Sequence, residues 1–247
     1  MSGEVAVFAG TTEGRELCER LSACGRDARA FTATDYGEAL VCDLPGIEVH
    51  AGRLDEEGMA VALRGCKTVV DATHPFAVEA SRTIAAACAR TGSRYVRLAR
   101  GRLDEEGEAV RVASVADAAA YLRAREGCAL VTTGSKEAHA FASPELLERV
   151  YLRVLPDASA IARLRGLGFP AARIIAMQGP FSRELNAAML KQIDARWLVT
   201  KSSGAAGGEG EKLAAARDAG ARVVLVERPV ERAGARSFDE VCSLLGV

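Results

Sequence analysis

The chain has 247 residues, of which 49% are apolar, so it can bury one large hydrophobic core or two smaller ones and is not a disordered protein. Its 32 Lys and Arg residues balance 33 Asp and Glu residues, and the net charge of -1 gives no long-range attraction to nucleic acid or to an anionic membrane. An anionic ligand must therefore be bound by a local site.

The apolar runs are short and interrupted by charge, and the N-terminal M-S-G-E-V lacks the basic and apolar regions of a secretory signal. These features predict a cytoplasmic protein that does not enter a membrane. The 7 cysteines are scattered without a C-x-x-C pair, and none of the 3 histidines pairs with another at ligand spacing. We therefore expect free thiols and no metal site.

Apolar runs of strand length alternate with segments of helical periodicity along the whole chain. In the first half we predict strands at 5–9, 28–32, 68–71 and 94–98, with helices from about residue 12 and from about 75 to 90. In the second half we predict strands at 129–133, 150–154, 173–177, 197–201 and 223–227. This alternation predicts an α/β fold made of two Rossmann-like, doubly wound parallel-sheet domains, residues 1–105 and 106–247, with a cleft between them.

Glycines, hydroxyl groups and isolated cations follow the predicted strands. In open α/β sheets, ligands bind at the carboxyl ends of the strands, so these residues are the candidates for a site. They are Gly10-Thr11-Thr12-Glu13-Gly14, Asp71-Ala72-Thr73-His74-Pro75-Phe76, Thr133-Gly134-Ser135-Lys136, Leu155-Pro156, Gln178-Gly179-Pro180-Phe181-Ser182 and Lys201-Ser202-Ser203-Gly204.

The first turn departs from the dinucleotide fingerprint G-x-G-x-x-G, because counting from Gly10 puts Thr12 and Arg15 at the other two glycine positions. The turn still offers helix N-terminal amides and two threonine hydroxyls to a diphosphate. Glu13 can then bond an amide of the first helical turn or a ribose hydroxyl. The alternative is a plain helix cap without a ligand.

Asp71-Ala72-Thr73-His74-Pro75 leaves a strand and is expected to enter a helix with proline in its first turn. In one interpretation Thr73 and the backbone line the nicotinamide side of a cofactor, and His74 handles a proton. In the other, Asp71 and Thr73 cap the helix and His74 is a surface residue.

The loop that begins Lys201-Ser202-Ser203-Gly204 puts a cation and hydroxyl groups at a second turn from strand to helix, which could receive phosphate or carboxylate. The alternative is a flexible solvated loop. The sequence leaves open which of the two turns holds the cofactor phosphates and favours the first, the usual cradle of a βα unit.

Taken in order, the motifs G-T-T-E, D-A-T-H-P-F, Y-V-R-L-A-R, T-T-G-S-K, R-V-L-P, M-Q-G-P-F-S-R-E-L-N and T-K-S-S-G resemble those of the precorrin-6A reductases and cobalt-precorrin-6A reductases of cobalamin biosynthesis. The resemblance runs from about Val5 to Pro229. It implies that a pyridine nucleotide reduces one ring double bond of a corrin precursor, with 1–105 as the cofactor-binding domain and 106–247 as the substrate-clasping domain.

A corrin precursor is a large, flat polycarboxylate, so its site needs separated cations and apolar surface. The cations at or beyond strand ends are Arg97, Arg100, Lys136, Arg153, Lys201 and Arg228, of which we expect about half to contribute. The full substrate-binding prediction is Phe76, Arg97, Ser135, Lys136, Arg153, Gly179, Pro180, Phe181, Lys201, Ser202, Ser203 and Gly204. The cofactor-binding prediction is Gly10, Thr11, Thr12, Glu13, Thr34, Asp71, Ala72 and Thr73, with His74 as the catalytic residue.

The expected cofactor is NADPH or NADH. Thr32-Ala33-Thr34-Asp35, at the end of the second predicted strand, contains no arginine, which favours NADH, whereas the resemblance favours NADPH. Two other functions stay open: a reductase of small dicarboxylates or imines similar to dihydrodipicolinate reductase, and a non-enzymatic nucleotide sensor. The sequence is compatible with a monomer and leaves open whether the corrin substrate contains cobalt.

Overall fold

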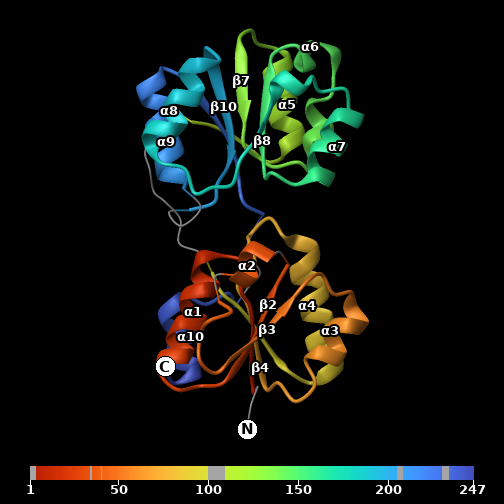
Figure 1. The fold of residues 1–247 in the computed structure, drawn as a ribbon, viewed down its shortest axis with the longest axis vertical. Coiled ribbons are helices and arrows are strands. Elements are labelled where there is room, and N and C mark those ends of the chain that lie inside the picture. The colour runs from red at the N-terminus through yellow and green to blue at the C-terminus, as the bar shows by residue number, and fades with distance from the viewer. Residues whose placement is uncertain (1–3, 34, 40, 100–108, 205–207, 230–233) are drawn as a thin grey trace. The chain divides into compact units, whose positions relative to one another are not determined.

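The computed structural model describes residues 4–33, 35–39, 41–99, 109–204, 208–229 and 234–247. The chain divides into two compact units, each of which is an α/β domain (Figure 1). Unit 1 comprises Met1–Gly101 and Val230–Val247, and unit 2 comprises Arg102–Pro229.

Unit 1 is built on a five-stranded parallel sheet with the order β3-β2-β1-β4-β5. Its strands are β1 (Val5–Phe8), β2 (Ala28–Thr32), β3 (Ile47–Ala51), β4 (Thr68–Asp71) and β5 (Arg94–Arg97). Its helices are α1 (Thr12–Ala23), α2 (Asp35–Ala39), α3 (Glu56–Ala62), α4 (Val78–Thr91) and α10 (Phe238–Leu245). The strand order reverses between β1 and β4, so the loops after these two strands flank the switch point at which such sheets bind ligands.

Alternation along β1 divides the core of unit 1 into two layers. Val5 and Val7 pack with α1 and α10 on one face of the sheet, while Ala6 and Phe8 pack with α3 and α4 on the other (Figure 1). Because both faces are covered, the strand is apolar at every position, which is typical of a parallel sheet.

The end of the chain returns to unit 1. Val241, Cys242 and Leu245 of α10 are buried against the face that α1 also covers, and the Arg236 amide and carbonyl bond to Arg97 and Ala99. The predicted division at 105/106 assigns this segment to the second domain, whereas residues 230–247 group with unit 1. The reason is the apolar face of α10, which completes the first core.

Unit 2 carries a six-stranded parallel sheet with the order β6-β11-β10-β7-β8-β9. Its strands are β6 (Val110–Val112), β7 (Cys128–Val131), β8 (Val150–Val154), β9 (Ile174–Ala176), β10 (Ala195–Lys201) and β11 (Arg222–Val226). Its helices are α5 (Val115–Arg123), α6 (Pro144–Leu147), α7 (Ala158–Gly166), α8 (Arg183–Gln192) and α9 (Glu209–Ala219), with the 3-10 turns η1 (Ala138–Phe141) and η2 (Ala171–Arg173). Helices α8 and α9 cover one face, and the switch point lies between β10 and β7 (Figure 1).

The predicted α/β class and its parallel sheets are confirmed, with two strands added. The short strands β3 and β6 lie at sheet edges and were not predicted. Helix α4 begins at Val78, later than the predicted residue 75, because the preceding residues form a turn in which the Ala77 amide donates to the His74 carbonyl (2.8 Å). Among the described residues, no helix is long and apolar enough to cross a bilayer.

Candidate active site

Thr11 closes the turn between β1 and α1. As the N-cap residue of α1, it accepts a hydrogen bond at its hydroxyl from the Gly14 amide (3.2 Å) and donates one to the Ala72 carbonyl (2.8 Å). Ala72 directly follows β4, so this hydroxyl joins the two loops that flank the switch point of unit 1. Thr11 therefore fixes the position of the turn.

The two glycines of this turn have different surroundings. A Cβ atom added to Gly14 would lie 2.8 Å from the Cα of Ala9 and 3.1 Å from the Cβ of Ala72, so close packing of the helix requires glycine there. At Gly10, which is exposed and does not have a positive φ angle, an added Cβ would meet nothing within 4 Å. The fold does not require glycine at residue 10, as expected where a ligand approaches the backbone.

These contacts change the register of the fingerprint. Counting from Gly10 puts Arg15 at the third position, but Gly14 is the glycine packed between helix and strand, as the third glycine of the fingerprint is. The pattern in this chain is therefore Ala9, Thr11 and Gly14. Gly14 lies inside the helix predicted from about residue 12, and a glycine inside a helix indicates close packing at that position.

A small pocket opens at this end of the unit 1 sheet. Its lining consists of Thr11, Glu13, Ala72, Thr73, Leu98 and Ala99. Glu13 is half-buried and Thr12 is exposed. The structure thus brings together the cofactor residues predicted after β1 and after β4, while the predicted Thr34 lies outside the described residues.

Asp71 is fully buried at the end of β4, and both of its carboxylate oxygens accept hydrogen bonds. Oδ1 accepts from the Thr73 amide (3.0 Å), the Thr73 hydroxyl (2.7 Å) and Nη1 of Arg97 (2.8 Å). Oδ2 accepts from the Tyr95 hydroxyl (2.7 Å), and Ser81 lies 3.2 Å from the Thr73 hydroxyl. The network fixes the backbone beneath the pocket.

The charge of Asp71 is set by this network. Burial raises the pKa of Asp71, but the Arg97 guanidinium and the hydrogen bonds from Tyr95, Ser81 and Thr73 outweigh burial, so the pKa lies below its ordinary value. Arg97 is 7% exposed. This arginine, predicted to bind substrate, is held in a buried ion pair within unit 1.

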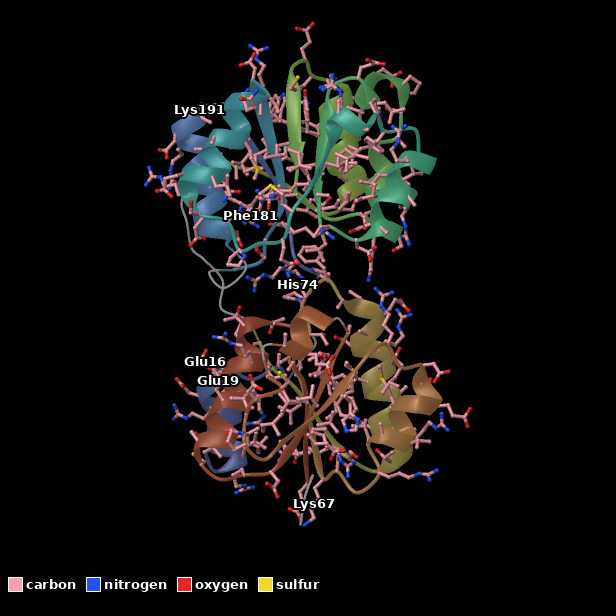
Figure 2. The ribbon with its side chains drawn as sticks, in the orientation of Figure 1. Glu16, Glu19, Lys67, His74, Phe181 and Lys191 are labelled. Atoms are coloured by element: carbon pink, nitrogen blue, oxygen red, sulfur yellow. The ribbon has the colours of Figure 1, made fainter. Side chains whose placement is uncertain are left out.

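His74 lies on the loop that follows β4 (Figure 2). Its Nδ1 accepts a hydrogen bond from the Phe76 amide (3.3 Å), and the two rings lie 5.7 Å apart. When Nδ1 accepts a hydrogen bond, the proton of a neutral imidazole is on Nε2. His74 is half-buried, and its Nε2–H is the group suited to donating to a ligand or a water.

In unit 2, the loop after β7 contains the predicted Ser135 and Lys136. Lys136 is exposed, and the Ser135 carbonyl accepts from the Ala138 amide (3.4 Å) at the start of η1. Within the described residues, the neighbouring Thr133 hydroxyl is buried without a hydrogen-bond partner. A polar atom of this kind is one that a ligand or water can satisfy.

A carboxylate of the chain itself closes the loop between β10 and α9. Glu209, the first residue of α9, is 2% exposed and accepts hydrogen bonds from the Gly204 amide (2.6 Å) and the Ser202 hydroxyl (3.4 Å). Ser203 is buried beside them, and Lys201 forms an ion pair with Glu137. The anion predicted for this loop is therefore supplied from within, by Glu209.

Arg153 lies near the end of β8 and is 7% exposed. Its guanidinium carbon lies 4.1 Å from the centre of the Phe181 ring, and its Nη1 donates to Oδ1 of Asn186 (2.7 Å). A Cβ atom on Gly179 would come within 3.0 Å of the same ring. The predicted residues Gly179, Pro180, Phe181 and Arg153 thus belong to one cluster, and Figure 2 labels Phe181 in it.

Several residues of these clusters were not predicted from the sequence to act in a site: Ser81, Tyr95, Glu137, Asn186 and Glu209. Ser81, Tyr95 and Asn186 lie within helices or strands, and their bonds to Thr73, Asp71 and Arg153 are made only in the folded chain. Glu209 follows a glycine-rich loop, where an acidic residue is typical of the start of a helix, and this pattern could have predicted it. Among the described residues, no three His, Cys, Asp or Glu side chains could together hold a metal ion.

The strand order of unit 1, its glycine turn and the pocket at its switch point define an α/β domain of the Rossmann class. The family described as Precorrin-6x reductase CbiJ/CobK matches residues 4–246, and the chain belongs to this family. It is therefore an oxidoreductase of cobalamin biosynthesis, and the family implies a nicotinamide cofactor.

Known proteins similar to this chain cover nearly all of it. The cobalt-precorrin-6A reductase of Priestia megaterium is 33% identical over 98% of this chain and 97% of its own length. That of Salmonella typhimurium is 36% identical, with 92% and 88% covered. A solved structure of CobK precorrin-6A reductase matches with a TM-score of 0.78 and 25% identity over 100% of this chain and 97% of that one. The matches span both units and are with precorrin-6A and cobalt-precorrin-6A reductases, so they support neither a small-dicarboxylate reductase nor a sensor confined to the first hundred residues.

Proposed function

We propose that this chain reduces one ring double bond of cobalt-precorrin-6A, with the diphosphate of a nicotinamide cofactor bound at the turn from Gly10 to Gly14. The observation that carries the cofactor site is Gly10, which faces open space and which the fold itself does not require as glycine. The relatives named cobalt-precorrin-6A reductase support the metal-containing substrate, and metal-free precorrin-6A is the alternative.

The residues of unit 1 fit such a cofactor. The N-terminus of α1 supplies backbone amides and the positive end of a helix dipole to a diphosphate. Glu13, in the first turn of α1, lines the pocket beside Thr73, where it suits a ribose hydroxyl. The β10–α9 loop fits less well, because Glu209 already occupies it.

The hydride and the proton of the reduction have separate sources. When bound, the nicotinamide supplies a hydride, and a proton delivered to the adjoining carbon completes the reduction of a C=C bond to a CH–CH bond. The Nε2–H of His74 holds a water that gives its proton to the ring carbon, and the hydroxide left behind takes a proton from solvent. Phe76 lies beside His74 as apolar surface. Asp71 and Arg97 act as positioning residues, since each is bonded to the other beneath Ala72 and Thr73.

The end of β2 is where the choice between NADPH and NADH is made in this class of fold. Thr32 is buried there, and its hydroxyl has no hydrogen-bond partner within the described residues. Residues 32–35 contain no arginine that could bind a 2′-phosphate, which supports NADH by local chemistry. The resemblance supports NADPH, so the two donors need a direct comparison.

The test is anaerobic oxidation of NADH and of NADPH by the purified chain, supplied in turn with precorrin-6A and with its cobalt form. Turnover with the cobalt form at the higher kcat/KM supports the proposal and selects the donor. Tight nucleotide binding without turnover of either substrate contradicts it.

A substitution at the first turn tests the cofactor site. Thr12→Glu places a negative charge beside the proposed diphosphate and is expected to raise the KM of the cofactor at least about 10-fold, with little change in the KM of the corrin substrate. The matched control is Thr83→Glu on α4, outside the pocket, which should change neither value. A rise confined to the corrin KM would move the cofactor to another site.

A second substitution tests His74. His74→Gln keeps a polar side chain but removes the imidazole, and we expect kcat to fall about 100-fold with both KM values nearly unchanged. A kcat within a few-fold of the wild-type value would show that the proton reaches the ring without His74.

A further inference from the structure

Arg153 is a buried cation without a carboxylate partner among the described residues. Its hydrogen bonds within that part of the chain are made by Nη1 alone, to Oδ1 of Asn186 (2.7 Å) and the sulfur of Met189 (3.6 Å). Burial lowers the pKa of Arg153 to about 10, so the side chain is still a cation at neutral pH. A buried guanidinium with only neutral partners is costly unless a ligand supplies the counter-charge.

The remaining donors of Arg153 can be reached by a ligand. Nε and Nη2 make no hydrogen bond within the described residues. Neither nitrogen is fully buried, so both keep some contact with solvent. One edge of the guanidinium is thus bonded to the protein, and another is left for a partner. A carboxylate matches such an edge, because it can accept two parallel N–H bonds.

Asn186 holds the guanidinium in this orientation. Asn186 is 3% exposed, its Oδ1 accepts from Arg153, and its Nδ2 donates to the carbonyls of Phe181 (3.2 Å) and Ser182 (2.8 Å). The side chain therefore ties the arginine on β8 to the loop that carries the Phe181 ring. A neutral amide does this without cancelling the positive charge, whereas an aspartate at the same position would cancel it.

Apolar surface lies beside this cation. Leu155 and Met177 directly follow the neighbouring strands β8 and β9, and they are 52% and 38% exposed. The Met177 amide bonds to the Val154 carbonyl (3.0 Å), which keeps the two strand ends together. Exposed apolar side chains next to a buried cation fit a ligand that is both flat and apolar and carries carboxylates.

We propose that Asn186 is a positioning residue that holds the Arg153 guanidinium ready for a carboxylate of the macrocyclic substrate, whose ring packs on Phe181, Leu155 and Met177. This inference rests on the proposed function for the identity of the macrocycle. The subsite itself requires only a flat polycarboxylate.

The first experiment measures binding without turnover. Uroporphyrin, a flat macrocycle with eight carboxylates, is titrated against the full chain by absorbance, and a porphyrin with four N-methylpyridinium groups serves as the probe of opposite charge. Arg153→Met is expected to weaken uroporphyrin binding at least about 10-fold and to leave binding of the cationic porphyrin unchanged. The matched control is Arg173→Met, which removes another arginine of unit 2 that stacks on an aromatic ring, Tyr151 (4.6 Å), and should change neither affinity. Equal weakening by both substitutions would overturn the subsite.

The second experiment is a double-mutant cycle for Asn186 in steady-state turnover of cobalt-precorrin-6A. Asn186→Ala and Arg153→Met should each raise the KM of the corrin substrate at least about 5-fold with a smaller effect on kcat, and the double variant should match Arg153→Met alone, because Asn186 acts through Arg153. Additive effects would overturn the positioning role. Asn186→Asp places a carboxylate beside Arg153 and cancels its charge. This variant should raise the KM of the corrin substrate even if its melting temperature is no lower than that of the wild type.

The two experiments separate the subsite from the function on which it rests. If the wild-type chain turns over neither corrin, the proposed function fails, and the porphyrin titration still decides whether Arg153 selects carboxylates. If the wild type turns over and both Arg153→Met and Asn186→Ala keep the wild-type corrin KM, the subsite is wrong and the function stands.

Discussion

The two units treat the same pair of features in opposite ways. Each has a buried arginine, 7% exposed, near the end of a parallel strand, and each has a turn that leads into a helix. In unit 1, Asp71 neutralises Arg97 and the turn at Gly10 is open. In unit 2, Glu209 fills the turn, and Arg153 has no carboxylate partner among the described residues. Whether the chain supplies its own counter-charge is what distinguishes a structural group from a binding group.

The largest expected effect concerns the two arginines. Arg97→Met leaves the Asp71 carboxylate buried without a counterion and should reduce the free energy of unfolding by about 3–5 kcal/mol. Arg153→Met removes the donor to Oδ1 of Asn186 and to the sulfur of Met189, both neutral groups, and should cost about 1–2 kcal/mol. Urea unfolding followed by circular dichroism measures both, and equal losses would break the comparison.

A smaller effect is expected at the filled turn. Glu209→Ala leaves the Gly204 amide buried without its acceptor and should cost about 1–3 kcal/mol in the same unfolding assay. The KM of the cofactor should stay at the wild-type value, because the proposed diphosphate site is in unit 1. A cofactor KM raised together with the loss of stability would show that the β10–α9 loop contacts the nucleotide.

The two glycines of the open turn give a matched pair. Gly14→Ala forces a Cβ to within 2.8 Å of the backbone of Ala9, so we expect a loss of about 1–3 kcal/mol from overpacking. Gly10→Ala meets no atom of the protein and should change stability by less than about 0.5 kcal/mol, while it raises the KM of the cofactor. If Gly10→Ala left that KM unchanged, the open space would not be a ligand site.

The smallest expected effect is the pH dependence of the stability that Asp71 contributes to unit 1. The pKa of Asp71 is depressed in the folded chain, so its contribution to stability is fully present above its ordinary value of 3.8 and is lost as the pH falls through the lower, folded value. Asp71→Asn has no such titration and should show a flatter decline of melting temperature below pH 4. Parallel curves for the two proteins would contradict the depressed pKa.

Much of the fold follows from periodicity. Both sheets consist of apolar runs buried on two faces, and the sequence marks such runs clearly, as at Val5–Phe8 and Val150–Val154. The edge strands β3 and β6 were missed because they are short or half-exposed and contain polar residues such as Glu48 and Arg111. The return of α10 to unit 1 depends on which sheet its apolar face covers, and no local signal states that.

The candidate site was predicted less completely. The loops after β1 and β4 were predicted and do meet at one pocket. Arg97 and Arg153 are indistinguishable in sequence, since each is the next-to-last residue of its predicted strand and follows an apolar residue. Only the tertiary structure shows that Asp71, 26 residues before Arg97, neutralises one of them, while Asn186, 33 residues after Arg153, leaves the other charged.

The return of residues 230–247 to unit 1 also bears on how the chain folds as it is made. The ribosome synthesises the whole of unit 2, a continuous segment, before it reaches Val241, Cys242 and Leu245, which complete the core beneath α1. Domains usually fold in the order of synthesis, with the N-terminal one first. In this chain all of unit 2 is synthesised before α10, so the face of the unit 1 sheet that α1 and α10 share is only partly covered until the last residues are made.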